Sequence, residues 1–224
     1  FNLVLPVGIS FYTFQTMSYS IDIYREKIGP MNSFLDFACY AAFFPQLVAG
    51  PIVRSDYFRK QIKNPLTLSM VNMKIGITLI IYGLFKKMVI ANNVAIQVDY
   101  IFTSGHDFTN FWLVWAGAFL FGIQIYADFS AYTDIARGSA KIFGIDLPEN
   151  FKHPYFAASP QEFWKRWHIS LSTWLRDYLY IPLGGSHNGI RVLIFSTMAT
   201  MFLGGLWHGA SWNFILWGLL HGLA

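Results

Sequence analysis

Long stretches without a charged side chain limit most strongly how this chain can fold. The stretch Phe111–Tyr126 contains no Asp, Glu, Lys or Arg. A second apolar stretch, from Met70 to Val98, has Lys74 near its start and is interrupted by Lys86 and Lys87. Only 12% of the 224 residues are charged, whereas soluble domains carry about 25%. Because such a small number of charged side chains cannot cover the surface of the protein, lipid must surround much of the chain. With no strand alternation or repeat, the sequence predicts an all-α, polytopic membrane protein.

The first half of the sequence contains apolar segments of different lengths. Phe1–Tyr24 can cross a bilayer as one helix of ~20 residues. Phe34–Val48 is shorter and contains proline, which indicates a buried or re-entrant helix that protein must shield. Arg54–Lys63 mixes basic and aromatic side chains, so we expect an amphipathic segment at the cytoplasmic membrane interface. For Met70–Val98 we expect one span ending at the two lysines and a shorter helix beyond them, followed by a polar loop over Asp99–Asn110.

In the second half we expect Phe111–Tyr126 to be a span, with a junction after it that contains Asp128 and Asp134. Three prolines between Asp146 and Pro160 predict a structured connector. Ser159 followed by Pro160 is typical of a helix start. A 3.6-residue period from there to Tyr178 predicts one amphipathic interfacial helix, with His168 at the border of its apolar face. Two further spans are expected to begin at Arg191 and Trp212.

Charge and cysteine content exclude several classes of partner. The net charge of +4 comes from short basic clusters between apolar stretches, as in loops that face the cytoplasm and anionic lipid. No nucleic-acid-binding motif accompanies it, so no nucleic acid is expected. The single Cys39 excludes an intrachain disulfide, and no metal-binding spacing is present, so no metal site is predicted. Since Phe1 and Ala224 both lie in apolar stretches, we expect residues 1–224 to be a single membrane domain truncated at both ends.

Two histidines stand in the most informative settings. His208 is flanked by Gly205, Trp207 and Gly209 in an apolar stretch, and ionisable groups at membrane depth are costly and usually functional. Glycine permits close approach of a ligand or backbone, and a neutral imidazole there can accept a proton from a hydroxyl that attacks an acyl group. The alternative is a buried histidine bonded to a neighbouring carbonyl. For His168 the alternative is an ordinary interfacial residue.

Other polar residues carry weaker signals. Lys165 and Arg166 beside His168 suit phospholipid head groups or a phosphate-bearing cofactor. Asp128 and Asp134 could carry protons or orient a hydroxyl, and a solvated or capped helix junction explains them equally well. We expect His221, on an apolar face, to be structural.

Five segments together resemble the membrane-bound O-acyltransferase family, and most closely its bacterial branch that contains alginate O-acetyltransferases. The resemblance covers nearly the whole chain in order. The segments are residues 43–52 (FFPQLVAGPI), 128–136 (DFSAYTDIA), 163–172 (FWKRWHISLS), 174–185 (WLRDYLYIPLGG) and 205–210 (GLWHGA).

This resemblance implies a funnel-shaped helical fold with a tunnel across the bacterial inner membrane. It implies that His208 is the essential catalytic residue and His168 a second functional histidine. The expected reaction moves an acetyl group from a cytoplasmic donor, acetyl-CoA, towards an extracytoplasmic polysaccharide such as alginate, with periplasmic acetyltransferase subunits as partners. Lys165, Arg166 and Arg176 are the candidates for binding the donor's phosphates.

Two alternatives remain open at this point. One keeps the fold but transfers D-alanine from a carrier protein to teichoic acid. The other is a non-enzymatic acyl or proton channel in which the histidines carry protons.

Overall fold

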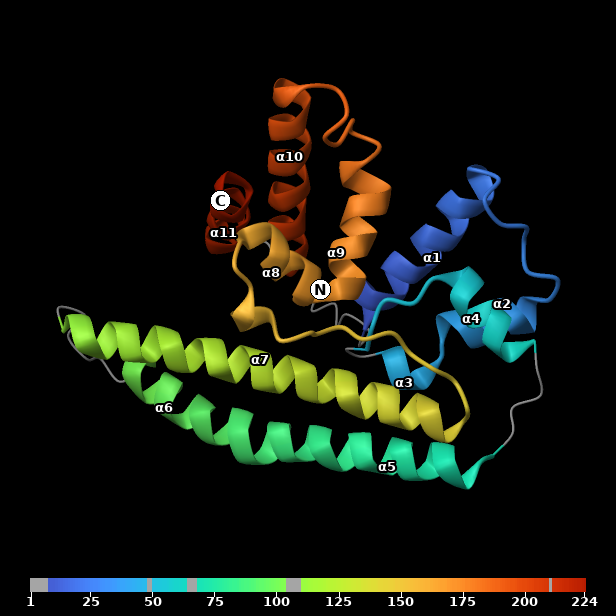
Figure 1. Ribbon diagram of the computed structural model, residues 1–224, viewed down its shortest axis with the longest axis horizontal. Coiled ribbons are helices and arrows are strands. Elements are labelled where there is room, and N and C mark those ends of the chain that lie inside the picture. Colours follow the sequence, from blue (N-terminus) through green and yellow to red (C-terminus); the bar gives the residue numbers. More distant parts are fainter. Residues whose placement is uncertain (1–7, 48–49, 64–67, 104–109, 210) are drawn as a thin grey trace, which may run out of the picture. The chain divides into compact units, whose positions relative to one another are not determined.

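The computed structural model describes residues 8–47, 50–63, 68–103, 110–209 and 211–224. Every regular element within these residues is helical, which confirms the predicted all-α class (Figure 1). The chain divides into two compact units, residues 1–148 and 149–224. Each unit is described by itself.

The first unit begins with four short helices around an aromatic core. They are α1 (Ile9–Tyr24), α2 (Phe34–Ala41), α3 (Phe44–Leu47) and α4 (Ser55–Ile62). The segment Phe34–Val48, which we expected to form one short helix, is divided into α2 and α3. Val48 and residues 1–7 of the first predicted span lie outside the described residues. The Tyr40 hydroxyl donates to the carbonyls of Gln15 and Val53. Its ring lies against Phe58, so burial of this tyrosine ties α1, α2 and α4 together.

The expected helix end at Lys86 and Lys87 is wrong. Helix α5 (Met70–Phe85) continues through a π-helical turn, η1 (Lys86–Ala91), into α6 (Asn92–Thr103). Residues 99–103 of the expected polar loop are thus helical, and residues 104–109 lie outside the described residues. Both lysines are accommodated within the helix because each forms an ion pair with an aspartate of the neighbouring helix α7.

The expected helix end after Tyr126 is also wrong, since α7 runs without interruption from Phe111 to Ile142. Asp128 and Asp134 therefore lie inside a helix and not at a junction. The sequence pattern suggested that these two carboxylates would need solvent. Ion pairs with Lys86 and Lys87 compensate their charges instead.

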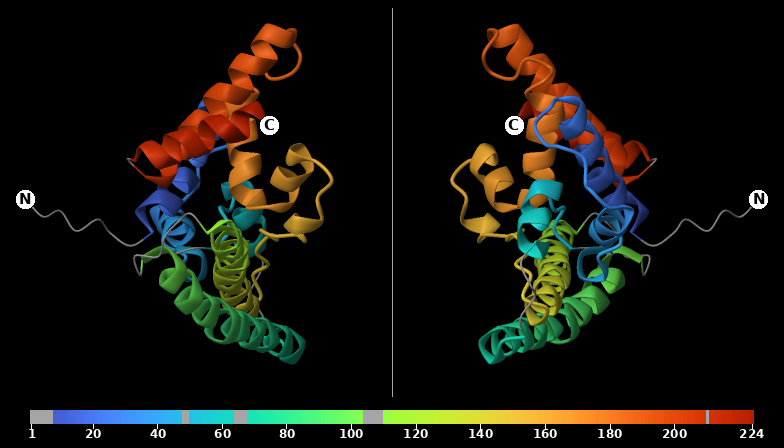
Figure 2. Two further views of the ribbon diagram at one scale, coloured as in Figure 1. Left: turned by 90° about the vertical axis from the view of Figure 1, so that its left-hand side faces the viewer. Right: turned by 90° about the vertical axis from the view of Figure 1, so that its right-hand side faces the viewer.

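Helices α5 and α7 pack antiparallel (Figures 1 and 2). Glycines bring their backbones together. A Cβ atom on Gly76 would lie 2.6 Å from the carbonyl oxygen of Gly138, and one on Gly83 would lie 2.7 Å from that of Ala131. Small residues at such crossings are typical of helix pairs in membranes. The close crossing sets the two lysines of η1 beside the aspartates of α7.

The second unit begins with the predicted connector and helix start. A 3₁₀ turn, η2 (Pro154–Phe156), precedes α8 (Pro160–Arg166). The Ser159 hydroxyl accepts a hydrogen bond from the Glu162 N–H, which confirms the predicted N-terminal cap. Helix α9 (Ile169–Leu175) follows, then the π-helical η3 (Arg176–Tyr180), α10 (Ile190–His208) and α11 (Trp212–Leu223).

The expected continuous helix from Pro160 to Tyr178 is wrong. Trp167 is extended and His168 is left-handed, with φ 43° and ψ 53°, so the chain turns between α8 and α9. His168, which we expected at the border of the apolar face of one long helix, is therefore the residue at which that helix breaks.

Among the residues that the structure describes, three helices are long and apolar enough to cross a membrane: Met70–Thr103, Phe111–Ile142 and Ile190–His208. At 1.5 Å per residue, the shortest, with 19 residues, is about 28 Å long, close to the ~30 Å of a bilayer core. These helices support the predicted polytopic membrane architecture.

Candidate functional site

His168 occupies the break between α8 and α9, where it is 2% exposed. A left-handed backbone is uncommon for residues other than glycine, although His is enriched there among such residues. Its Nδ1 atom lies 3.3 Å from Oδ1 of Asn150. The imidazole is therefore held at a fixed orientation inside the second unit.

Asn150 builds this part of the site by binding three consecutive residues. Its main-chain carbonyl accepts from the Ile169 N–H, and its Oδ1 accepts from both the N–H and the hydroxyl of Ser170. These bonds satisfy the first N–H groups of α9, which a helix start leaves without intrahelical partners. Asn150, itself 1% exposed, was missed by the sequence analysis because it lies 18 residues before His168 in a connector.

The bonding at Asn150 determines which nitrogen of His168 can act as a base. Since Oδ1 already accepts from Ser170, the bond with His168 requires Nδ1–H as the donor. Burial lowers the pKa of His168 to about 3, and the charge of a protonated His208 is a second, smaller cause. His168 is therefore neutral near neutral pH and carries its lone pair on Nε2.

His208 is the last residue of α10, and its side chain is exposed in the described part of the chain. Its ring stacks on Phe214, with centroids 6.0 Å apart, and meets the Trp217 edge at 5.1 Å. The crossing of α10 with α11 places these rings together. A Cβ on Gly205 would lie only 2.3 Å from the Phe214 carbonyl oxygen, so the predicted role of glycine in close approach is confirmed there.

Trp207 contacts both predicted catalytic histidines. Its ring centroid lies 6.4 Å from that of His168 and 4.8 Å from that of His208. The ring contacts then continue from His208 through Trp217 to His221, which lies 4.6 Å from Trp217. The structure thus brings His168 and His208 into one aromatic cluster of the second unit.

His221 lies at the far side of this aromatic cluster, against Trp164 at 5.2 Å as well as Trp217. The structural role expected of His221 stays a prediction. Trp164 comes from α8, so the cluster also joins α8 to α11.

Two of the three basic residues predicted to bind donor phosphates are paired with carboxylates. Arg166 forms an ion pair with Glu162 one helical turn earlier, and Arg176 Nε donates to Asp177 at 2.8 Å. Lys165 is exposed on α8. The hydrogen bond from the Ala158 N–H and, as the smaller cause, the bond from Arg166 lower the pKa of Glu162. The role of these three cations in phosphate binding stays a prediction.

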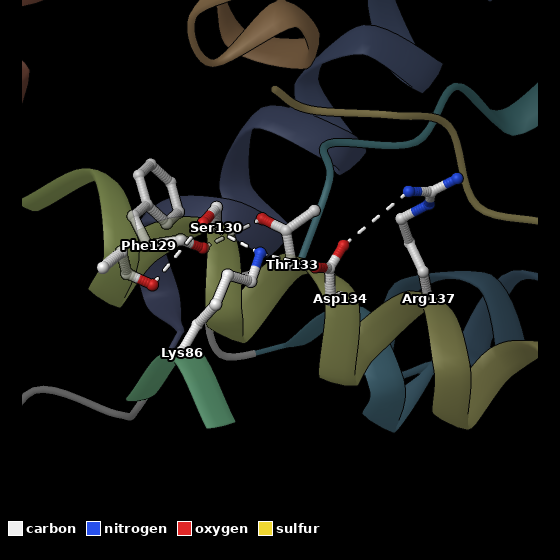
Figure 3. A network of polar contacts seen from close by, with 7 residues as sticks. Lys86, Phe129, Ser130, Thr133, Asp134 and Arg137 are labelled. Atoms are coloured by element: carbon white, nitrogen blue, oxygen red, sulfur yellow. Dashed lines mark hydrogen bonds and ion pairs between the residues drawn. The ribbon is translucent and has the colours of Figure 1, made fainter. Parts of the chain in front are cut away.

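A second polar cluster lies in the first unit between η1 and α7 (Figure 3). Lys86 Nζ lies 2.5 Å from Asp134 Oδ2 and donates to the Ser130 hydroxyl at 2.9 Å. Lys87 pairs with Asp128 at 2.6 Å. Asp134 also lies 3.8 Å from Arg137. The aspartates for which proton transfer was considered are thus ion-paired inside membrane-crossing helices.

The described residues contain no group of three or more His, Cys, Asp or Glu that could hold a metal ion. What the second unit offers is a neutral, oriented imidazole and a second, accessible imidazole in an aromatic setting. Such a pair can accept and return a proton during attack of a hydroxyl on a carbonyl.

Comparison with known proteins gives the same family that the sequence motifs resemble. The sequence model of the membrane-bound O-acyltransferase family matches residues 24–224. A probable alginate O-acetylase, AlgI, of Pseudomonas putida is 44% identical over 222 residues, which cover 99% of this chain and 45% of the relative.

More distant relatives are named for other substrates. The peptidoglycan O-acetyltransferase of Helicobacter pylori is 40% identical, over all of this chain and 47% of its own length. The teichoic acid D-alanyltransferase of Bacillus subtilis is 30% identical, over 98% of this chain and 58% of its own length. The chain thus spans about half the length of the curated relatives it matches.

Proposed function

Because this chain belongs to the membrane-bound O-acyltransferase family, we propose that it is part of an O-acyltransferase for an extracytoplasmic polysaccharide. The acyl group is acetyl, the donor is acetyl-CoA on the cytoplasmic side, and alginate is the polymer class that the P. putida relative's name favours. The proposed location is a bacterial inner membrane.

One observation carries this proposal: Asn150 holds His168 as a neutral imidazole in the same aromatic cluster as His208. Acyl transfer to a hydroxyl needs a base that is unprotonated near neutral pH. Because burial keeps His168 neutral, His168 places no positive charge beside His208, the imidazole to which we assign the proton transfer. The exposed side chain of His208 is the one that a substrate can reach.

The proposed reaction is balanced by one proton. The acceptor hydroxyl gives its proton to the imidazole of His208 as its oxygen attacks the thioester carbonyl. The carbon–oxygen bond forms, the carbon–sulfur bond breaks, and the imidazolium returns the proton to the departing thiolate. His168 acts as a positioning residue for the cluster. No metal or redox partner is needed for this balance.

Donor binding is assigned to cations of the second unit. Lys165, Arg166 and Arg176 are the proposed contacts for the donor's phosphates. Arg166 and Arg176 would have to exchange their present carboxylate partners for phosphate oxygens. Of the three, the exposed Lys165 is the most readily available.

The most direct test of this function is donor dependence in the full-length protein. Membranes from a deletion strain that expresses it would receive radiolabelled acetyl-CoA, and label in the extracytoplasmic polymer would be counted. Incorporation above the level of the empty strain supports the proposal. Absence of incorporation in the presence of the periplasmic acetyltransferase subunits that we propose as partners would contradict it.

A second candidate function rests on the D-alanyltransferase relative. D-alanyl transfer to teichoic acid would use a charged carrier protein as donor in place of coenzyme A. The same membranes given D-alanyl carrier protein distinguish the two. Acyl movement that survives loss of both His168 and His208 would instead favour a channel.

A further inference from the structure

A cavity of the first unit lies outside the histidine site and is lined by cations. Its volume is about 270 Å³, and its lining comes from α1, the connector after it and α4. The lining residues are Tyr19, Ile28, Gly29, Met31, Ser55, Asp56, Arg59, Lys60 and Lys63. With three cations and one carboxylate, the cavity lining carries a formal charge of +2 (3 − 1).

The charge is arranged by the helical period of α4. One face of α4 begins with Asp56. The three cations lie three, four and seven residues after it, which places them on the same face as Asp56: Arg59, Lys60 and Lys63. Phe58 on the other face is fully buried in the core of the first unit. Core packing therefore fixes α4 and turns its basic stripe into the cavity.

These cations have the capacity to bind an anion. Arg59 Nη1 donates to the Gly29 carbonyl at 3.0 Å, which orients the guanidinium, and an arginine has five N–H donors in all. Lys60 lies 3.5 Å from Asp56, but both side chains are exposed, at 77% and 47%, so the pair is weak. Lys63 has no ion pair within the part of the chain that the structure describes.

The position of the cavity along the chain brings it near the membrane boundary. Lys63 precedes Met70, the first residue of a candidate span, by seven residues, and an extended chain covers at most about 3.6 Å per residue. The cavity lining at Lys63 thus lies within roughly 25 Å of the start of that span. Head groups of anionic lipids, and soluble phosphates at the same surface, reach this zone.

The size of the cavity favours a small polar group. Its 270 Å³ corresponds to about nine water molecules at ~30 Å³ each, and it is smaller than the pockets of roughly 300–1,000 Å³ that hold drug-sized ligands. Arginine and lysine together bind phosphate oxygens through charge-assisted bonds. We propose that this cavity binds a phosphate group, carried either by an anionic phospholipid or by a soluble phosphate compound.

The test measures binding directly on the full-length protein in detergent and does not depend on acyl transfer. In the lipid arm, native mass spectrometry compares retention of phosphatidylglycerol and phosphatidylcholine with identical acyl chains. In the soluble arm, calorimetry measures binding of inorganic phosphate and of coenzyme A. The variant is Lys60→Gln/Lys63→Gln, whose two positions are exposed, one on α4 and one directly after it. The control is Lys152→Gln/Arg191→Gln, which removes two exposed cations that do not line the cavity.

Preference of the wild type and control for phosphatidylglycerol, reduced about tenfold in the variant, would identify a lipid head group as the ligand. A similar loss confined to the soluble arm would identify a soluble phosphate. Equal binding by variant and control in both arms would overturn the proposal. Arg59→Lys provides a second comparison, because it keeps the charge but removes the planar fork. We expect Arg59→Lys to bind more weakly than the wild type. The unfolding temperatures of Arg59→Lys and Lys60→Gln/Lys63→Gln, which should equal that of the wild type, show that the loss is not one of folding.

Discussion

Nδ1 of His168 lies 3.3 Å from Oδ1 of Asn150, an oxygen that also accepts two hydrogen bonds from Ser170. This arrangement fixes the tautomer of the imidazole and the backbone break that carries it. A residue of the connector thereby determines the chemistry available at the start of α9.

Replacement of Asn150 should therefore damage both stability and activity. Asn150→Ala removes the acceptor of three hydrogen bonds, those from the N–H and hydroxyl of Ser170 and from Nδ1–H of His168. Each unsatisfied buried donor costs about 1–3 kcal/mol, and partial relaxation should bring the total loss of unfolding free energy to roughly 2–4 kcal/mol. Thermal unfolding in detergent measures it. The control is Asn188→Ala, at an exposed turn, which should change the unfolding temperature little; equal effects would refute the role of Asn150.

The low pKa of His168, about 3, predicts acid sensitivity. The unfolded chain takes up a proton near pH 6.5, whereas the folded one does not until about pH 3. Stability is therefore fully present above pH 6.5 and falls as the pH drops from 6.5 towards 3, by up to about 1.4 kcal/mol per pH unit.

Unfolding of the wild type and of His168→Asn, measured at pH 7 and pH 5, tests this dependence. Asparagine tolerates the left-handed backbone but does not titrate, so the variant should lose less stability between the two pH values. Parallel losses in both proteins would contradict the assignment.

The crossing of α10 and α11 offers a matched pair of adjacent glycines. A Cβ on Gly205 would meet the Phe214 carbonyl oxygen at 2.3 Å, whereas one on Gly204 would lie 3.5 Å from a Leu175 methyl group. Gly205→Ala should cost about 1–3 kcal/mol through overpacking and displace His208 from Trp217. Gly204→Ala should be close to neutral. Unfolding of the two variants side by side decides the matter, and a larger loss at Gly204 would show that the crossing is not as described.

The break between α8 and α9 shows which features of the fold can be predicted from the sequence alone and which cannot. The cap at Ser159 and the starts of α10 and α11 follow from local signals and were predicted. The break at His168 was not, because the 3.6-residue period continues across it. Only the bonds to Asn150, formed in the folded state, interrupt the helix there.

The opposite error arose at Lys86 and Lys87. Charge inside an apolar stretch indicated a helix end, yet the helix continues because Asp134 and Asp128, more than forty residues away, compensate the lysines. For the site, the sequence indicated the two histidines through their neighbours, and their catalytic role stays a prediction. Their shared contact with Trp207 required the tertiary structure.

The Lys86–Asp134 pair should be costly to break and cheap to replace as a whole. Its side chains are only 12% and 14% exposed, and removal of one partner from such a pair costs about 3–5 kcal/mol. Asp134→Asn should show that loss in thermal unfolding, and Lys86→Met/Asp134→Leu should recover most of it. Lys60→Gln, at an exposed pair, is the control and should change stability by less than about 1 kcal/mol. A double variant no more stable than Asp134→Asn would argue against a simple ion pair.

The most direct test of the proposed chemistry is polymer acetylation by the full-length protein carrying His208→Ala. The matched control is His187→Ala, in an exposed turn of the same unit. With equal amounts of protein in the membrane, the account predicts a loss of at least about 100-fold for His208→Ala, the lower range for a general base, and wild-type acetylation for His187→Ala. Unchanged acetylation in His208→Ala would contradict it.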